Sequence, residues 1–476
     1  MANALREFLE LSYAELEELN LAAKEQRLKR VPADQVREER MKYLHDEKRI
    51  KAVTVLFCDL EGRLHMLDYD KKFLLKSADN LTFDGSSIRG FTAQSESDLR
   101  LGIDWHAFYW VPADVFGPGK VMVFGDVLEK DGSPYAADTR SILKRFTEQL
   151  FKEKGYTLNA ANEIEGFLFK GENAEREFYR TGKFEFVNTG GYYHSLPGDP
   201  LRLFIDTVAE VQRAMGFQNE KDHPEVAPSQ FEINYAYTEA LVAADTIQLY
   251  KLICRQVASK QGLTASFLPK PMMGVNGSGM HTNISVSQNG KNLFWDPKGE
   301  ENLSQFAWQF VDRILTHAND ICLILNSSVN AYRRLDPHFE APNQIIASPV
   351  DRGAMVRIPI GNERSSRIEV RSVAPDANPY LVMYSLFRTG LEGNISPDPN
   401  LRKAKRFLPD NIYDAITNFC NSEWVNKLLG EDLKSRFAEL KQASADRCPR
   451  LLGNLVKIQE VQYHHEVYNQ YLWNLF

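Results

Sequence analysis

Cysteine is scarce in this sequence, and its few occurrences follow no functional pattern. Five cysteines occur among 476 residues, and no two of them form a CxxC pair. An odd number of scattered thiols cannot all pair within one chain. The cytosol is therefore the expected location.

Long apolar runs and an excess of positive charge are also absent. No stretch approaches the 18 apolar residues that a membrane span needs, and the first residues, MANALREFLELSYAELEELNL, lack the basic start and apolar run of a signal peptide. The net charge is −7, and no basic tract or aromatic RNA-binding motif occurs. With 43% hydrophobic and 25% charged residues the composition is that of a globular protein, for which we expect no membrane and no nucleic-acid partner.

Three common catalytic motifs are missing as well. There is no GxxxxGK[ST] loop, no GxSxG turn and no cysteine in a recognisable nucleophile motif. A bound nucleotide would therefore have to be held by groups other than a P-loop.

The chain divides into three parts by its residue pattern. Residues 1–47 are rich in Glu, Leu, Lys and Arg, contain a Ser-x-x-Glu capping box, and predict two helices broken near Pro32. Short strands follow in residues 48–135, beginning with a hairpin. Alternating helices and strands then fill residues 136–476. This pattern predicts an α+β protein in which a small β-rich domain precedes a larger one.

Acidic side chains share one face on several predicted strands of the larger part. Side chains alternate between the two faces of a strand, so NEIEGFLF places two glutamates on one face, and SRIEVRSV places a glutamate between two arginines. HPEVAPSQFEINYAY adds two glutamates, and GMHTNISVS adds a histidine. Each of these residues alone is commonly structural or solvated, but together they predict a metal site: Glu163, Glu165, Glu225, Glu232, His281 and Glu369.

Carboxylate-rich sites of this kind suit hard divalent cations. Mg²⁺ and Mn²⁺ prefer oxygen ligands, and Mn²⁺ also accepts an imidazole. Six ligands suit two ions better than one, and paired ions usually neutralise phosphate. Guanidinium groups bind phosphate and carboxylate through paired hydrogen bonds, and five of them crowd nearby: Arg334, Arg352, Arg357, Arg367 and Arg371. The residues predict direct phosphoryl transfer to a bound substrate.

Six segments, in this order, resemble the signature segments of the type I glutamine synthetase family. They are FDGSSIRGF with SESD after it, NEIEGFLF, EVAPSQFEIN, PKPMMGVNGSGMH, RRLDPHFEAP and RIEVRSVAPDANPYL. The resemblance covers residues 48–476. It implies an N-terminal β-grasp domain and a catalytic domain whose curved antiparallel sheet forms a funnel-shaped active site. It also implies a dodecamer of two hexameric rings, with active sites between subunits.

The reaction implied by the resemblance is ATP-dependent ligation of ammonia to the γ-carboxylate of L-glutamate through γ-glutamyl phosphate, with two or more Mg²⁺ or Mn²⁺ ions per site. One metal would be held by Glu165, Glu225 and Glu232, and the other, nearer the ATP phosphates, by Glu163, His281 and Glu369. Glutamate would be held by Asn276, Gly277, Arg334 and Arg371. ATP would be held by Tyr237, Asn283, Ser285, Arg357 and Arg367.

Four further residues receive catalytic roles from the resemblance. Arg352 would neutralise the transferring phosphoryl group, and Glu340 would head a flap that closes over glutamate. Asp84, helped by Asp98, would reach into the neighbouring subunit's site, bind ammonium and take its proton.

Two alternatives use the same scaffold. Ligases that join glutamate to polyamines or other amines tend to lose the ammonium-binding aspartate or to alter the flap glutamate, and non-enzymatic members of the eye lens would lose metal ligands. All of these residues are present here. The sequence favours the ammonia-dependent reaction, with an amine ligase as the main alternative.

Some features depart from the family pattern. RFLPDNIYDAI aligns with a later helix start rather than with the insert that carries the adenylylated tyrosine of many bacterial members, so Tyr413 lies in a different element. Ala93 stands where feedback-regulated members of the Bacillus kind carry arginine. We therefore expect neither mode of regulation. Residues 1–47 predict a helical lid or a subunit contact, and the tail VYNQYLWNLF resembles the strap that inserts into the opposite ring.

Overall fold

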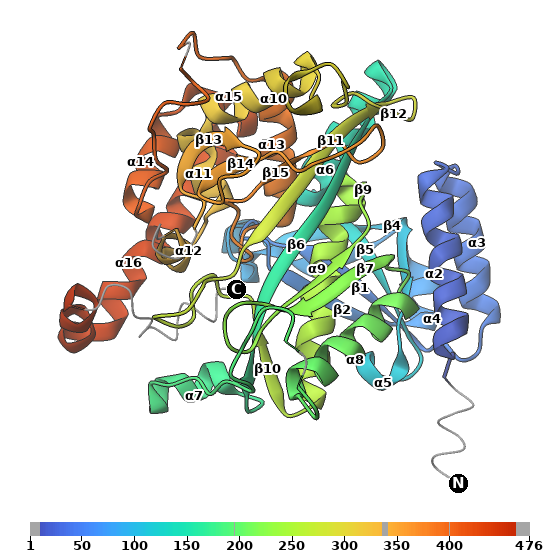
Figure 1. Cartoon of the computed structure of the whole chain (residues 1–476). Helices are drawn as coiled ribbons and strands as arrows, with labels where there is room; N and C mark the ends of the chain where they lie inside the picture. Colours follow the sequence, from blue (N-terminus) through green and yellow to red (C-terminus); the bar gives the residue numbers. More distant parts are fainter. Residues whose placement is uncertain (1–9, 195, 336–340, 399, 463–476) are drawn as a thin grey trace.

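Two β-sheets organise the chain, and two helices precede the first of them (Figure 1). The computed structural model describes residues 10–194, 196–335, 341–398 and 400–462, and their side chains apart from those at 179–181 and 447–462. The two leading helices are α2 (Tyr13–Leu28) and α3 (Ala33–Asp46), which lie on either side of Pro32 as the sequence predicts.

Helix α2 begins with the predicted capping box and is fixed at its middle by one asparagine. The Ser12 hydroxyl accepts from the Glu15 backbone N–H, and the Glu15 carboxylate accepts from the Ser12 N–H. Asn20 donates to the carbonyls of Trp110 at 2.8 Å and Ala214 at 2.9 Å, and accepts from the Trp110 N–H at 3.0 Å. This buried side chain therefore joins the leading helix to both of the parts that follow.

The first sheet is mixed and contains five strands. They are β1 (Ala52–Cys58), β2 (Leu64–Asp70), β3 (Leu81–Asp84), β4 (Asp98–Trp110) and β5 (Lys120–Leu128). Their order is β2-β1-β5-β4-β3, with β1 and β5 parallel and the other pairs antiparallel. The β1–β2 hairpin turns at Gly62, whose φ of 87° favours glycine.

The second sheet contains ten strands. They are β6 (Tyr156–Lys170), β7 (Asn219–Pro224), β8 (Gln230–Tyr235), β9 (Thr238–Glu239), β10 (Leu263–Ser266), β11 (Met280–Gln288), β12 (Lys291–Asn292), β13 (Gln344–Ser348), β14 (Ala354–Arg357) and β15 (Ile368–Val370). The main order is β13-β14-β15-β11-β6-β8-β7, antiparallel except for the pair β13–β14. The long strands β6 and β11 run side by side through the middle of the sheet (Figure 1).

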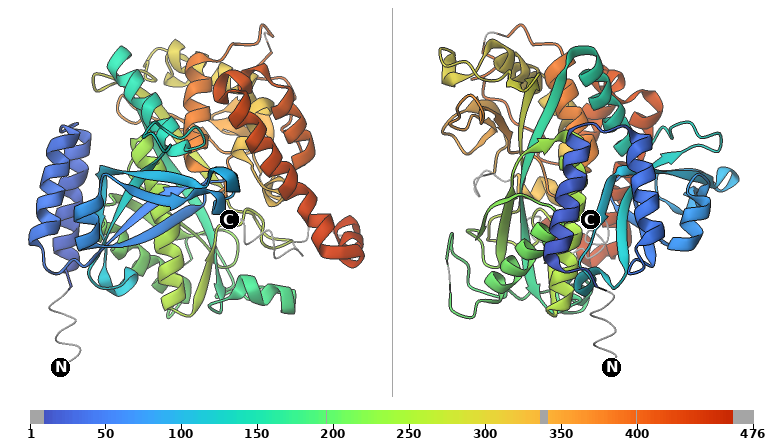
Figure 2. Two further views of the ribbon diagram at one scale, coloured as in Figure 1. Left: turned by 180° about the vertical axis from the view of Figure 1, so that it is seen from behind. Right: turned by 90° about the vertical axis from the view of Figure 1, so that its right-hand side faces the viewer.

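Helices pack against the second sheet, and Figure 2 shows them from two further sides. Short helices α4 (Lys71–Ser77) and α5 (Ala113–Phe116) belong to the first sheet's connections. The others are α6 (Thr139–Lys154), α7 (Ala174–Thr181), α8 (Pro200–Ala214), α9 (Ala240–Lys260), α10 (Gln305–Thr316), α11 (Ala318–Leu325), α12 (Val329–Arg334), α13 (Pro379–Glu392), α14 (Ile412–Asn421), α15 (Glu423–Leu429) and α16 (Glu431–Gln462). Tyr413 lies in the first turn of α14, as the sequence predicts.

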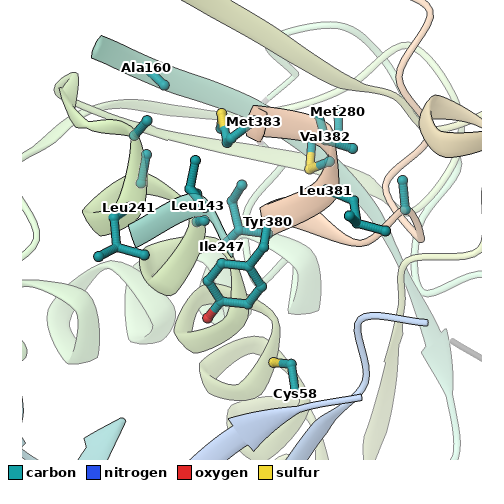
Figure 3. Packing of buried hydrophobic residues seen from close by; sticks show 14 of the residues in the cluster. Cys58, Leu143, Ala160, Leu241, Ile247, Met280, Tyr380, Leu381, Val382 and Met383 are labelled. Carbon is teal, nitrogen blue, oxygen red and sulfur yellow. The ribbon is translucent and has the colours of Figure 1, made fainter. Parts of the chain in front are cut away.

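The core lies where α6, α9 and α13 pack together against β6. Figure 3 shows Leu143 and Ile247 from two of these helices near Tyr380, with Cys58 of β1 below them. All four side chains are fully or almost fully buried. The Tyr380 hydroxyl donates to Asp245 at 2.9 Å, so the one polar atom of that ring is satisfied.

A buried ion network joins the first sheet to the helices α2, α6 and α9. The Arg140 guanidinium, on α6, donates to Asp126 at 2.7 Å, to Asp245 at 2.8 Å and to Asp104 at 3.0 Å. Arg27 of α2 also donates to Asp245, at 3.1 Å. Removing one partner from such a network costs about 3–5 kcal/mol, because it leaves a buried charge uncompensated. The network therefore fixes the first sheet and α2 against α6 and α9.

The fold agrees with the sequence-based prediction of a small β-rich domain, a larger α+β domain and a curved sheet. The parallel pair β13–β14 is a detail that the predicted antiparallel sheet lacked. Among the described residues, no helix is both long enough and apolar enough to cross a membrane. The tail from residue 463 lies outside the described residues.

Candidate active site

Strand register brings the predicted metal ligands together. On β6, Glu163 and Glu165 are two residues apart and share one face. Glu163 pairs with His281 of β11, and Glu165 pairs with Glu232 of β8. Glu369 of β15 lies one strand beyond β11, opposite Asn283. Four strands thus place these side chains around a common space.

One cluster contains Glu163, His281 and Glu369, whose ligand atoms lie within 4.8 Å of one another. The His281 Nδ1 atom is 3.7 Å from Glu163 Oε2 and 3.6 Å from Glu369 Oε1. Burial disfavours the charged form of Glu163, but the adjacent His281 and Asn283 lower its pKa to about 2. Two carboxylates and an imidazole are a suitable ligand set for a divalent cation.

A second cluster contains His223, Glu225 and Glu232. His223 lies 3.4 Å from Glu225 and 3.5 Å from Glu232. Glu165 is the strand partner of Glu232. Burial, with the neighbouring carboxylates of Glu165 and Glu232, raises the pKa of Glu225 to about 8, and burial also raises that of Glu165. Carboxylates this crowded cannot all remain charged by themselves, so the donor set fits a bound cation.

His223 was not among the predicted ligands. The signal available in the sequence was its position two residues before Glu225, in HPEV. A lone histidine beside a glutamate does not reveal that β7 and β8 pair with His223 opposite Glu232, which is what brings the imidazole into the cluster.

A cavity of about 520 Å³ is lined by the first cluster, by Glu225 and Glu232 of the second, and by the arginines. Of its 21 lining residues, 13 were singled out from the sequence, and Lys221, Gln230 and Tyr192 are among those that were missed. The predicted residues in this wall are Glu163, Glu165, Glu225, Glu232, Asn276, Gly277, His281, Arg334, Arg352, Arg357, Arg367, Glu369 and Arg371.

Arg334 is held rigidly at the base of this cavity. Its guanidinium donates to the carbonyls of Arg371 at 2.9 Å and of Ser372 at 3.3 Å, and burial lowers its pKa to about 10. A Cβ atom on Gly277 would lie 3.0 Å from the Arg334 Cγ atom and 2.6 Å from the Pro269 carbonyl oxygen. The glycine turn is therefore required for the arginine to occupy this place.

The segment SRIEVRSV faces the cavity with its charged side. Only Ile368–Val370 forms the strand β15, but Arg367 and Arg371 on either side also line the cavity. Arg357 donates to the buried Glu369 carboxylate at 2.8 Å, and Arg371 lies 3.3 Å from its other oxygen. Glu369 is therefore held between two cations at the edge of the first cluster.

A second cavity, of about 980 Å³, adjoins the first. Glu163, Lys221 and Arg367 line both. The second cavity also contains Asn283 and Ser285, which follow His281 on the same face of β11, and the half-exposed Tyr237. Asn283 donates to Glu163 at 3.1 Å and accepts from Arg367 at 2.8 Å. A chain of polar contacts thus links the two cavities.

Asp84 and Asp98 lie elsewhere, paired at the ends of β3 and β4. Both are exposed, and neither lines the two cavities just described. Hydrogen bonds from Ser86 and Ser87 lower the pKa of Asp84, so this carboxylate is stabilised in its charged form. Glu340 lies outside the described residues, and Ala341, which follows it, lines the first cavity.

Comparisons with known proteins point in one direction. Residues 49–130 match the family described as "Glutamine synthetase, beta-Grasp domain", and residues 136–454 match "Glutamine synthetase, catalytic domain". Two similar relatives are the glutamine synthetases of Clostridium saccharobutylicum (35% identity) and Staphylococcus aureus strain MRSA252 (36%), each aligned over 84% of this chain and 93% of its own length. A cryo-electron-microscopy structure of Plasmodium falciparum glutamine synthetase has a TM-score of 0.78 at 21% identity, covering 88% of this chain and 98% of its own, which shows a common fold.

Proposed function

Since this chain belongs to the glutamine synthetase family of enzymes, we propose that it joins ammonia to the γ-carboxylate of L-glutamate with the hydrolysis of ATP to ADP and phosphate. The observation that carries the proposal is the cavity in which two carboxylate–histidine clusters face a row of arginines and open towards a second, nucleotide-sized cavity.

In the first step, the γ-carboxylate oxygen of glutamate forms a bond to the γ-phosphorus of ATP, and the bond between that phosphorus and the bridging oxygen breaks. The products are γ-glutamyl phosphate and ADP. Arg334 and the Asn276–Gly277 turn hold glutamate, while Arg352 and Arg357 neutralise charge on the transferred group. Divalent cations, Mg²⁺ or Mn²⁺, would be held by the two clusters and would supply further neutralisation of the phosphates.

The nucleotide would occupy the second cavity. Arg367 lies at the boundary of the two cavities, where the phosphates of ATP would pass from one to the other. Asn283 and Ser285 offer hydrogen bonds along β11, and Tyr237 offers an aromatic face for the base. This placement leaves the γ-phosphate beside Glu163 and His281.

In the second step, ammonia displaces phosphate from the acyl carbon to give glutamine. Asp84, held in its charged form, binds ammonium and takes one proton, and a second proton leaves as the amide forms. Because Asp84 and Asp98 line neither of the two active-site cavities of their own chain, we place them at the site of a neighbouring subunit. The proposed assembly is therefore a homo-oligomer, a dodecamer of two hexameric rings, located in the cytoplasm.

The decisive experiment compares nucleophiles. The purified protein is supplied with ATP, L-glutamate and a divalent cation, with either ammonium or putrescine, and glutamine, γ-glutamylputrescine and phosphate are measured. We expect glutamine with ammonium, and loss of that reaction in Asp84→Ala. Product formation only with putrescine would establish the amine-ligase alternative instead.

Light scattering tests the assembly independently of activity. We expect a particle of twelve chains, and separate hexamers after deletion of the last eight residues. A monomer that makes glutamine at full rate would contradict the placement of Asp84 in a neighbouring site.

A further inference from the structure

A third cavity, of about 250 Å³, lies between the β1–β2 hairpin and α9, and it shares no lining residue with the two cavities of the active site. The hairpin contributes residues 61–64 and 66. Helix α9 contributes residues 248, 251, 252 and 255, whose spacing places them on one face. The cavity therefore lies at the junction between the first sheet and the catalytic part.

Two buried carboxylates line this cavity with an oxygen that is not hydrogen-bonded within the described part of the chain. Asp376 is 8% exposed; its Oδ2 atom accepts from Ser328 at 2.6 Å, while Oδ1 has no hydrogen-bond partner. Glu61 is 7% exposed; its Oε1 atom accepts from Lys441 at 2.9 Å, while Oε2 makes no hydrogen bond but lies 3.5 Å from Arg89 and 3.9 Å from Arg63. Buried polar atoms are almost always hydrogen-bonded, and leaving one unpaired is unfavourable.

A buried cation lines the same cavity. Lys251 is 8% exposed, and the one hydrogen bond recorded for its ammonium group among the described residues goes to the Pro375 carbonyl. An ammonium group can donate three hydrogen bonds, so Lys251 has capacity left. It forms no ion pair with Asp376 within the described structure, although both groups line the cavity. Burial lowers the pKa of Lys251 to about 7, which is the expected result for an ammonium group with too few partners.

The remaining wall combines arginines with apolar side chains. Arg63 and Arg255 also line the cavity and are less buried than Lys251. Leu252 and Phe267 provide apolar surface. An occupant that satisfies Asp376 and Lys251 needs a hydrogen-bond donor for the first, an acceptor for the second, and a short apolar body. An inorganic anion would satisfy Lys251 alone, and a metal ion would satisfy Asp376 alone.

We propose that this cavity binds a small zwitterionic amino carboxylate, with its ammonium group towards Asp376 and its carboxylate towards Lys251. A volume of about 250 Å³ accommodates such a molecule of a few carbon atoms. The ligand would contact both the hairpin and α9, and would therefore fix the first sheet against the catalytic part. This inference stands on the cavity alone and does not depend on the proposed reaction.

Calorimetric titration of the full-length protein tests the proposal. The probes are glycine, β-alanine and γ-aminobutyrate, with acetate and methylammonium as probes that carry only one of the two charges. We expect at least one of the three zwitterions to bind with one site per chain, and both single-charge probes to bind at least tenfold more weakly.

Variants locate the binding. Asp376→Asn keeps the size of the side chain and removes its charge, and should weaken binding tenfold or more. Leu252→Trp fills the cavity and should abolish binding. The matched control is Leu203→Trp on the exposed face of α8, which should bind as the unmodified protein does. Circular dichroism and gel filtration check that each variant is folded.

Two results would overturn the proposal. If none of the three zwitterions shows saturable binding, the cavity contains only water, which can itself satisfy isolated buried polar atoms. If a zwitterion binds but Asp376→Asn leaves its affinity unchanged, the molecule is bound elsewhere, for example in the active-site cavity. Asp376→Asn decides the question even if Leu252→Trp fails to fold.

Discussion

Replacing Asn20 by alanine should destabilise the protein far more than its single side chain suggests. Asn20 is 4% exposed, and its side chain is hydrogen-bonded from α2 to both β4 and α8. Its amide donates to the carbonyls of Trp110 and Ala214, and its oxygen accepts from the Trp110 N–H. In the alanine variant these three backbone groups lose that partner in a place that water enters poorly.

The magnitude follows from those hydrogen bonds. Each buried group left without a partner costs about 1–3 kcal/mol. The two amide hydrogens of Asn20 are shared among more than two carbonyl acceptors, and the variant can relax in part. The loss of stability therefore corresponds to about two unpaired backbone groups. We expect Asn20→Ala to lower the free energy of unfolding by about 2–5 kcal/mol. Asn20→Asp should cost at least as much, because it presents a carboxylate to two carbonyl oxygens.

Urea unfolding at a fixed protein concentration measures this effect, with tryptophan fluorescence as the signal, since Trp110 is buried at the contact. The matched control is Asn173→Ala, because Asn173 is exposed at the start of α7 and its side chain makes no capping hydrogen bond. A surface change of this kind stays within about 0.5 kcal/mol. If Asn20→Ala shifts the urea midpoint no more than Asn173→Ala does, the asparagine does not join the three elements.

Further predictions concern the site and the pH response. Glu369→Gln should lower the rate of glutamine formation about 10²–10³-fold without changing the circular dichroism spectrum. The control Glu210→Gln on α8 should leave the rate unchanged. If the two variants form glutamine at the same rate, Glu369 does not belong to the site. Gly277→Ala should raise the KM for glutamate, measured at saturating ATP, because the new Cβ atom would meet Arg334 and the Pro269 carbonyl, and an unchanged KM would contradict that geometry. Chelation of divalent cations should lower the melting temperature of the protein. Added Mn²⁺ at 100 times its Kd should restore about 2.7 kcal/mol of stability. A melting temperature that does not respond to the chelator would argue against bound cations. Burial and the nearby Asp126 raise the pKa of Asp138 from 3.8 to about 6, so the folded chain binds more protons than the unfolded chain between these pH values. The stability of the unmodified protein relative to Asp138→Asn should therefore fall as pH rises from 4 to 6. A difference in urea midpoint that stays constant over this range would refute the prediction.

Much of the fold could be predicted from the sequence because local signals agreed with it. The capping box at Ser12 and Glu15 places the start of α2 correctly, and alternation along NEIEGFLF places Glu163 and Glu165 on one face. Such signals depend only on neighbours in the chain. The strand β15 shows their limit, since a pattern of eight residues corresponds to a strand of three.

The parts of the site that could not be predicted depend on contacts between distant segments. His223 joins Glu232 because β7 and β8 pair in one particular register, and nothing in HPEV encodes that register. Lys251 is on α9, and its burial against Pro375 follows from the packing of a loop far along the chain. The roles assigned to Asp84 and Glu340 remain predictions.

The strand β11 contributes side chains both to the first cluster and to the second cavity. His281 belongs to the first cluster, and Asn283 and Ser285 line the second cavity. All three are on β11, which pairs with β6 along its whole length and with β15 along part of it. Because β11 is held by its neighbours in this way, the spacing between its side chains is fixed by the backbone. If ATP binds as proposed, the spacing between the groups of β11 that contact it is set by the backbone, and a change of base specificity would require changes in side chains such as Tyr237 rather than in this strand.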